Sequence, residues 1–319
     1  PHPPGAPLFL LIGRFFSLFA LGDVERVAYW INISSVLSSG FSILFLFWTI
    51  TALANKLMGL KPGQGSDDQN WSIIAAGLVG SLAYTFSDSF WFSAVEAEVY
   101  AISSFFTAFV VWAILKWEQI DDDRHRNRWF LLLAYTVGLS IGIHLLNLVA
   151  IPALGLIVYF KYYKEVTTKG VLTTLAVSGA IILIIMAGVI PGLPSLAFSF
   201  ELFFVNSLGL PFKSGIIVFV LLFLGALIYG IIYSEKKEKV ILNTSLLAFA
   251  FILIGYSSYT VVLIRSNYNP PIDENNPENV NTFVSYLKRE QYGDRPLFYG
   301  QYFTTELQEQ KKGAPVYAK

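Results

Sequence analysis

The chain has 319 residues, of which 55% are hydrophobic and only 14% are charged, and its formal net charge is zero. A soluble domain carries about 25% charged residues, so this chain could not cover its surface with polar groups and needs a bilayer as its solvent. The zero net charge excludes a basic surface for nucleic acid, and the absence of cysteine excludes disulfides, thiolate metal sites and a cysteine nucleophile.

The first residues predict a short helix after a rigid start. The segment Pro1-His2-Pro3-Pro4 cannot be helical, because each proline fixes its own backbone and restricts the residue before it. Residues 5–21 are apolar apart from Arg14, and we expect either a short helix that enters the membrane from outside or the end of a loop that starts before the chain. Because the chain begins without Met, we expect it to be part of a longer protein.

Long apolar stretches follow, and a transmembrane helix needs about 20 such residues. The ranges that meet this requirement, two of them marginally, are 29–53, 71–87, 99–117, 171–190, 215–233 and 240–264. The predicted fold is therefore an all-α polytopic membrane protein, a multi-span helical bundle of about eight spans or half-spans. We divide it into a membrane domain over 1–264 and the start of an outer domain over 265–319.

Residues 129–160 are apolar over too great a length for one upright span. A single kinked helix and a hairpin of two short helices both fit this length. The basic residues of the loops are Lys56, Lys61, Lys116, Arg124, Arg126, Arg128, Lys161, Lys164, Lys169, Lys236, Lys237 and Lys239. Only a hairpin that turns near His144 and Asn147 puts all of them on one side, as the positive-inside rule requires. We therefore predict the hairpin, with Pro152 in the first turn of its second helix.

With the basic residues inside, several polar residues gather on the outer side. The outer loop 87–100 is mostly apolar and aromatic, so it should lie at the membrane interface, where carboxylates are partly desolvated and find partners. Glu96 and Glu98 can serve one site only if this stretch is not helical. The alternative interpretation is a solvated acidic loop.

Two histidines are further candidates on the outer side. His144 lies at the predicted helix break, where a role in binding substrate or phosphate competes with that of a structural hydrogen-bond donor. His2 lies on a preorganised turn, and it either orients a phosphate or belongs to a plain loop. The run Asp121-Asp122-Asp123 is interpreted as a solvated turn, and we predict no metal ligands in the chain.

The tail after Arg265 predicts a small α/β element on the outer side. Residues 279–291 have the pattern of a helix with Phe283, Tyr286 and Leu287 on one face, and residues 295–300 have that of a short strand closed by glycine. The sequence contains no Walker motif and no dinucleotide fingerprint, so the use of ATP or NAD has no support.

Several of these segments resemble one known family over nearly the whole chain. They are residues 2–9 (His2-Pro3-Pro4-Gly5-Ala6-Pro7-Leu8-Phe9), 94–101 (including Glu96-Ala97-Glu98-Val99-Tyr100), 138–147 (ending His144-Leu145-Leu146-Asn147), 269–272 and 286–297. They are similar to a bacterial membrane family labelled DUF2723, which is abundant in Bacteroidota and is related to a vertebrate transmembrane protein O-mannosyltransferase.

The resemblance implies a GT-C type glycosyltransferase whose active site faces the periplasm from the bacterial inner membrane. It implies a polyprenyl-phosphate-linked sugar donor, with mannose as the sugar, and a Ser or Thr hydroxyl of an exported protein as acceptor. It places the main catalytic carboxylate in an outer loop upstream of the His-Pro-Pro-Gly element, before Pro1. The resemblance therefore leaves open whether the chain as given is active.

The layout of polar residues predicts how such a reaction would run. We predict Glu96, Glu98 and His2 as catalytic residues, and Arg14, His144, Asn147 and Arg265 as ligands of the substrate or its phosphate. The alternative functions are a lipid-linked glycan flippase or small-molecule transporter, which the Gly and Pro residues near 138–155 would suit, and a scaffold without chemistry. The nearly charge-free spans and the lack of an inverted repeat favour the enzyme over the transporter.

Overall fold

The structure is a computed structural model that describes residues 5–61, 63–293, 300, 302, 304, 316 and 317. These residues form helices and connecting loops, without a β-strand among them. Six helical stretches within them are long and apolar enough to cross a membrane, or seven if the bent pair α3 and α4 is one broken span. The predicted all-α polytopic membrane fold is confirmed.

The chain forms two compact units, which we describe separately. The larger unit comprises Ala6–Leu183 and Ser234–Tyr259. The smaller unit comprises Pro1–Gly5, Ile184–Tyr233 and Thr260–Lys319. No observation on the structure tests the predicted division of the chain at residue 264, which stays a prediction.

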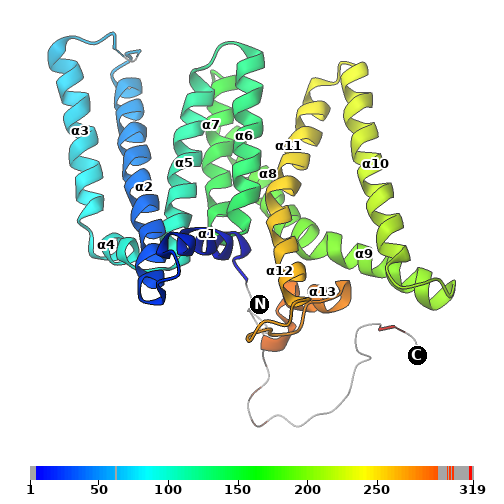
Figure 1. The fold of residues 1–319 in the computed structure, drawn as a ribbon. Helices are drawn as coiled ribbons and strands as arrows, with labels where there is room; N and C mark the ends of the chain where they lie inside the picture. The colour runs from blue at the N-terminus through cyan, green and yellow to red at the C-terminus, as the bar shows by residue number, and fades with distance from the viewer. Residues whose placement is uncertain are drawn as a thin grey trace. The chain divides into compact units, whose positions relative to one another are not determined.

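The larger unit is an array of helices that run side by side (Figure 1). Its elements are α1 (Pro7–Ser17), η1 (Leu18–Ala20), η2 (Val24–Arg26), α2 (Val27–Leu57), α3 (Asp67–Thr85), α4 (Asp88–Val95), α5 (Val99–Gln119), α6 (Asp123–Ile141), η3 (Leu145–Ala150), α7 (Ile151–Tyr162), α8 (Thr168–Leu183), α11 (Val240–Tyr256) and η6 (Ser257–Tyr259).

Local chemistry sets where these helices begin and bend. Ser66 and Gln69 form a capping box at the start of α3, and Asp122 caps α6 by accepting a hydrogen bond from the backbone N–H of His125 (2.8 Å). Hydrogen bonds from that N–H and from the His125 ring hold the pKa of Asp122 below its ordinary value of 3.8. Helix α4 turns away from α3 by 68°, so this pair does not continue as one straight span.

The predicted hairpin over 129–160 is confirmed. Helix α6 ends at Ile141, η3 follows His144, and α7 returns with Pro152 in its first turn. Proline suits this position because the first N–H groups of a helix have no partner within it.

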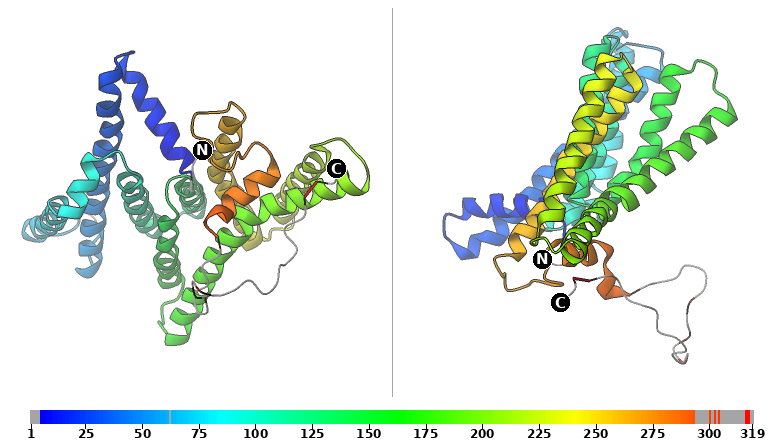
Figure 2. Two further views of the ribbon diagram at one scale, coloured as in Figure 1. Left: turned by 90° about the horizontal axis from the view of Figure 1, so that it is seen from below. Right: turned by 90° about the vertical axis from the view of Figure 1, so that its right-hand side faces the viewer.

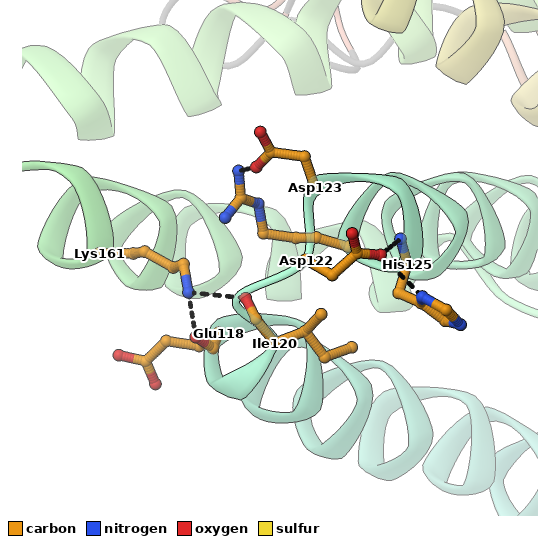
Figure 3. A network of polar contacts seen from close by, with 7 residues as sticks. Glu118, Ile120, Asp122, Asp123, His125 and Lys161 are labelled. Atoms are coloured by element: carbon orange, nitrogen blue, oxygen red, sulfur yellow. Dashed lines mark hydrogen bonds and ion pairs between the residues drawn. The ribbon is translucent and has the colours of Figure 1, made fainter.

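One end of the larger unit collects basic side chains, and we call it the basic end. Lys56 at the end of α2 pairs with the carboxylate of Glu118 near the end of α5. Lys161, near the end of α7, donates to the backbone oxygens of Glu118 and Ile120 (Figure 3). These contacts bring the ends of α2, α5 and α7 together, as the positive-inside argument required.

Helices α6 and α11 approach each other at glycines. A Cβ atom on Gly138 would lie 2.3 Å from the backbone oxygen of Ile252, and one on Gly255 would lie 2.4 Å from the backbone nitrogen of Leu139. Small residues let two membrane helices bring their backbones into contact, which is the main source of packing energy in lipid. Gly138 and Gly255 both lie near the C-terminal ends of their helices, and α11 runs parallel to α6 from the basic end (Figure 1).

The smaller unit departs from the predicted spans. Residues 171–190 were expected to form one span, but the helical course continues through the π-helix η4 (Ile184–Gly192), α9 (Leu193–Leu202) and η5 (Phe203–Ser207). Pro191 lies inside η4, and the wider π turns accommodate a residue that cannot donate an N–H. The helical course therefore does not end at residue 190, where the predicted span ended.

Helix α10 (Ser214–Lys236) starts on a buried carboxylate. Glu201 of α9 is only 1% exposed, and its two oxygens accept hydrogen bonds from the backbone N–H groups of Lys213 (2.5 Å) and Ile216 (3.1 Å). This arrangement satisfies N–H groups that a helix start leaves without partners, and it favours the negative charge. Glu201 therefore has a structural role at the start of α10.

The tail of the smaller unit contains α12 (Thr260–Ser266), α13 (Val280–Lys288) and η7 (Glu290–Tyr292). The predicted helix over 279–291 is confirmed; Phe283 and Tyr286 are buried, and α13 lies against α9 (Figure 2). The left-handed Gly5 approaches Tyr286 so closely that a Cβ atom would meet its hydroxyl at 2.2 Å, which explains the glycine of the His-Pro-Pro-Gly element. The predicted strand over 295–300 lies almost wholly outside the described residues.

Candidate functional site

The end of the larger unit opposite the basic end carries the candidate residues, and we call it the acidic end. It comprises α1, α4, the start of α5, the end of α6 and η3, and α1 lies crosswise there (Figure 1). The backbone N–H of Leu8 donates to the backbone oxygen of Gly142 (3.0 Å). Leu8 also packs against a cluster built on Ile102, Phe106 and Ile143. This apolar layer fixes α1 against the helix break.

Glu96 and Glu98 lie between α4 and α5 in non-helical backbone. Both residues have extended dihedral angles, and the N–H of Glu98 donates to the backbone oxygen of Glu96 (2.8 Å) across a tight turn at Ala97. The condition for both to serve one site, that this stretch is not helical, is met. Both side chains are exposed, and among the described residues neither carboxylate forms an ion pair.

His144 lies at the same end as these carboxylates, between α6 and η3. Its Nδ1 accepts a hydrogen bond from the backbone N–H of Leu146 (3.1 Å), and its half-buried ring lies 5.7 Å from the ring of Tyr100. A nitrogen that accepts carries no proton, so the neutral ring carries its proton on Nε2. Since Tyr100 follows Glu98 by two residues, the contact joins the helix break to the start of α5.

Asn147 is buried at 5% exposure and braces η3 against α5. The hydroxyl groups of Ser103 and Thr107 both donate to its side-chain oxygen, each at 2.8 Å. Its amide nitrogen, also buried, has no hydrogen-bond partner within the part of the chain that the structure describes. The contacts give Asn147 a positioning role, while its predicted contact with phosphate stays a prediction.

The remaining candidates have different placements. Arg14 is exposed on α1 at the acidic end, and its guanidinium donates to the hydroxyl of Ser17 (3.3 Å). Arg265 is exposed on α12 of the smaller unit, whose position relative to the larger unit is not determined. His2 lies outside the described residues. The structure thus brings Arg14, Glu96, Glu98 and His144 to one end of one unit.

The sequence argument missed three residues next to His144 and Asn147. Tyr100, Ser103 and Thr107 lie on α5, and their spacing of three and four places them on one helix face, which is the signal that could have found them. Within the described residues, no group of three or more His, Asp or Glu side chains could hold a metal ion.

Comparison with known proteins adds an independent finding about the first half of the chain. Residues 1–167 match the family described as the protein O-mannosyl-transferase TMEM260 N-terminal domain. The chain is 27% identical over 141 residues to protein O-mannosyl-transferase TMEM260 of Mus musculus, a match that covers 44% of this chain and 17% of that protein.

It is 24% identical over 161 residues to the protein of the same description from Dictyostelium discoideum, covering 47% of this chain and 18% of that protein. The matches thus span less than a fifth of the length of each relative. No solved structure matches the chain.

The matched residues include α1 to α7 and every candidate of the larger unit, whereas Arg265 lies beyond them. The match covers more than half of the chain, and the chain belongs to the family of the TMEM260 N-terminal domain.

Proposed function

We propose that this protein is a membrane glycosyltransferase of the GT-C type that moves a sugar, mannose, from a polyprenyl-phosphate donor to a Ser or Thr hydroxyl of an exported protein. The observation that carries this proposal is the family match, whose named relatives are protein O-mannosyl-transferases and whose range contains the acidic end. A lipid-anchored donor meets a protein acceptor at the membrane interface, which is where a helix end with polar side chains is useful.

The reaction needs a base for the acceptor and a partner for the leaving phosphate. The acceptor oxygen attacks C1 of the sugar, the bond from C1 to the phosphate oxygen breaks, and polyprenyl phosphate leaves with the electron pair. The proton of the acceptor hydroxyl goes to a carboxylate. We assign this proton to Glu98, while Glu96 orients acceptor or sugar hydroxyls and His2 is the third catalytic residue of the proposal.

The leaving phosphate needs hydrogen-bond donors or positive charge. His144 suits this role because its half-buried ring lies at the acidic end beside Tyr100, and an imidazole N–H can donate a hydrogen bond to a phosphate oxygen. Arg14 supplies an exposed guanidinium on α1 at the same end, and Arg265 lies at the end of the span Val240–Ser266. Asn147 acts through His144, since it ties η3 to α5.

The positive-inside rule orients this site. The basic end contains the lysines that join α2, α5 and α7, so we assign it to the cytoplasm and the acidic end to the periplasm of a bacterial inner membrane. A membrane-impermeant thiol reagent tests this orientation on single-cysteine variants. It should label a cysteine at position 98 from the periplasmic side, and a cysteine at position 164 only from the cytoplasmic side.

The proposed function is tested by measuring the transfer of mannose from its lipid donor to a peptide. Membranes containing the protein are supplied with radiolabelled polyprenyl-phosphate mannose and a Ser/Thr-rich peptide, and label on the peptide is measured. Transfer to the peptide supports the proposal, and its absence with an otherwise folded protein contradicts it. Movement of the labelled lipid across a sealed vesicle, without transfer, would instead establish the flippase alternative.

A further inference from the structure

A cavity at the basic end is unrelated to the site proposed above. It lies between α2 and α5, has a volume of about 240 Å³, and is lined by residues that include Trp48, Asn55, Trp112, Lys116 and Gln119. Lys116 follows Glu98 by 18 residues, almost the whole length of α5, which is about 27 Å along the helix axis. The cavity therefore cannot share a small ligand with the acidic end.

Lys116 is a half-buried cation without an anionic partner. Its Nζ lies 6.0 Å from the centre of the Trp112 ring, and no described carboxylate forms an ion pair with it. Glu118 is two residues away, but it is paired with Lys56. No carboxylate lines the cavity, so its positive charge is uncompensated there.

The other lining groups suit a membrane interface. The rings of Trp48 and Trp112 lie 5.3 Å apart, and tryptophan favours the headgroup level of a bilayer. Asn55 and Gln119 add amide groups beside them, while Ala52 and Leu115 make part of the wall apolar. A cation, amides and apolar wall together match a ligand that carries a phosphate on a hydrocarbon chain.

We propose that this cavity binds the headgroup of an anionic phospholipid, with its phosphate at Lys116 and its glycerol against the two tryptophans. Lysine binds phosphate as a point charge, and a lone cation in a partly apolar cavity gains more from an anion than one in open water. The lipid is favoured over inorganic phosphate because the walls are largely apolar and the cavity lies at the edge of a bilayer. The basic end faces the leaflet in which anionic lipids attract lysine and arginine.

Lipid binding can be counted directly. The purified protein is titrated with phosphatidylglycerol or phosphatidylcholine in detergent, and the lipids that stay bound are counted by native mass spectrometry. We expect one phosphatidylglycerol to be retained preferentially. We expect Lys116→Gln to weaken it about fivefold, the factor that one basic residue near an anionic membrane surface contributes.

Matched variants distinguish a specific lipid site at Lys116 from general electrostatic attraction between the basic end and anionic lipid. Lys164→Gln removes the same charge from an exposed loop of the basic end and should leave binding unchanged, while Lys116→Arg keeps the charge and should retain binding. Unaltered binding in Lys116→Gln overturns the proposal, and so does an equal loss in Lys116→Gln and Lys164→Gln. Displacement of the lipid by millimolar inorganic phosphate would also overturn it, because the phosphate alone would then be the ligand.

Discussion

The two ends of the larger unit are built by different means. The basic end is held by charge and polar contacts between helix ends, such as Lys56 with Glu118 and Lys161 with backbone oxygens. The acidic end is held by apolar packing of α1 and by buried hydrogen bonds at Asn147, and its carboxylates Glu96 and Glu98 form no ion pair within the described part of the chain. A paired carboxylate such as Glu118 helps to hold helices together, whereas carboxylates without an ion-pair partner, such as Glu96 and Glu98, are available to bind or react.

The largest expected effect is on the rate of mannose transfer, and it tests whether the carboxylates of the acidic end take part in the reaction. Glu98→Gln should lower the rate of mannose transfer about 100-fold, the lower bound of what a positioned acid or base contributes. Glu165→Gln, which changes an exposed carboxylate at the basic end, should leave the rate unchanged. Equal rates for the two variants in the peptide assay would remove the functional difference between the ends.

A packing change should weaken the fold near the acidic end. Gly138→Val places methyl groups where the backbone of α11 lies, and we expect it to lower the free energy of unfolding by about 1–3 kcal/mol. Gly179→Ala is the control, because a Cβ atom there meets nothing within 4 Å. Thermal unfolding in detergent measures both, and similar melting temperatures would show that α6 and α11 do not pack as described.

The buried hydrogen bonds of Asn147 should matter more than a local bond at the basic end. Asn147→Ala leaves the hydroxyls of Ser103 and Thr107 without their acceptor, and we expect a loss of about 1–2 kcal/mol. Asn70→Ala loses a bond from the first turns of α3 to Gly65 in the preceding loop and should cost less. A lower rate of mannose transfer in Asn147→Ala, with Glu98 still accessible to a chemical label, would show that Asn147 positions His144. An unchanged free energy of unfolding would contradict the role of Asn147 in holding η3 against α5.

The smallest effect concerns the helix start at the basic end. The depressed pKa of Asp122 means that its charge stabilises the folded state above pH 3.8, and that this contribution is lost as the pH falls through the lower folded pKa. Asp122→Asn should therefore lower the melting temperature slightly at neutral pH, and the difference should disappear in acid. A difference that grows as the pH falls from 5 to 3 would have the wrong sign.

Charge distribution and hydropathy were enough to predict the order of the helices and the hairpin, whereas the hydrogen-bond partners of individual side chains came only from the structure. The lysine clusters were enough to choose the hairpin, because a helix that crosses a membrane reverses the side on which its next loop lies. The spacing of Ser103 and Thr107 put them on one face but could not name Asn147 as their acceptor, since that contact joins residues about 40 positions apart. The predicted span 171–190 was too short because the helical course continues through a π-helix that contains Pro191.

The bend between α3 and α4 bears on how deeply the larger unit is immersed in the bilayer. Helix α4 turns by 68° and exposes Trp91 and Phe92, and at the same end the crosswise α1 exposes Leu11 and Phe15. We infer that these two short helices, which have exposed apolar side chains, lie along the membrane interface and set how deeply the larger unit is immersed. A substitution that tilts α1 or α4 would therefore shift the depth of Glu98 relative to the plane of the lipid phosphates, although it alters no residue that takes part in the reaction.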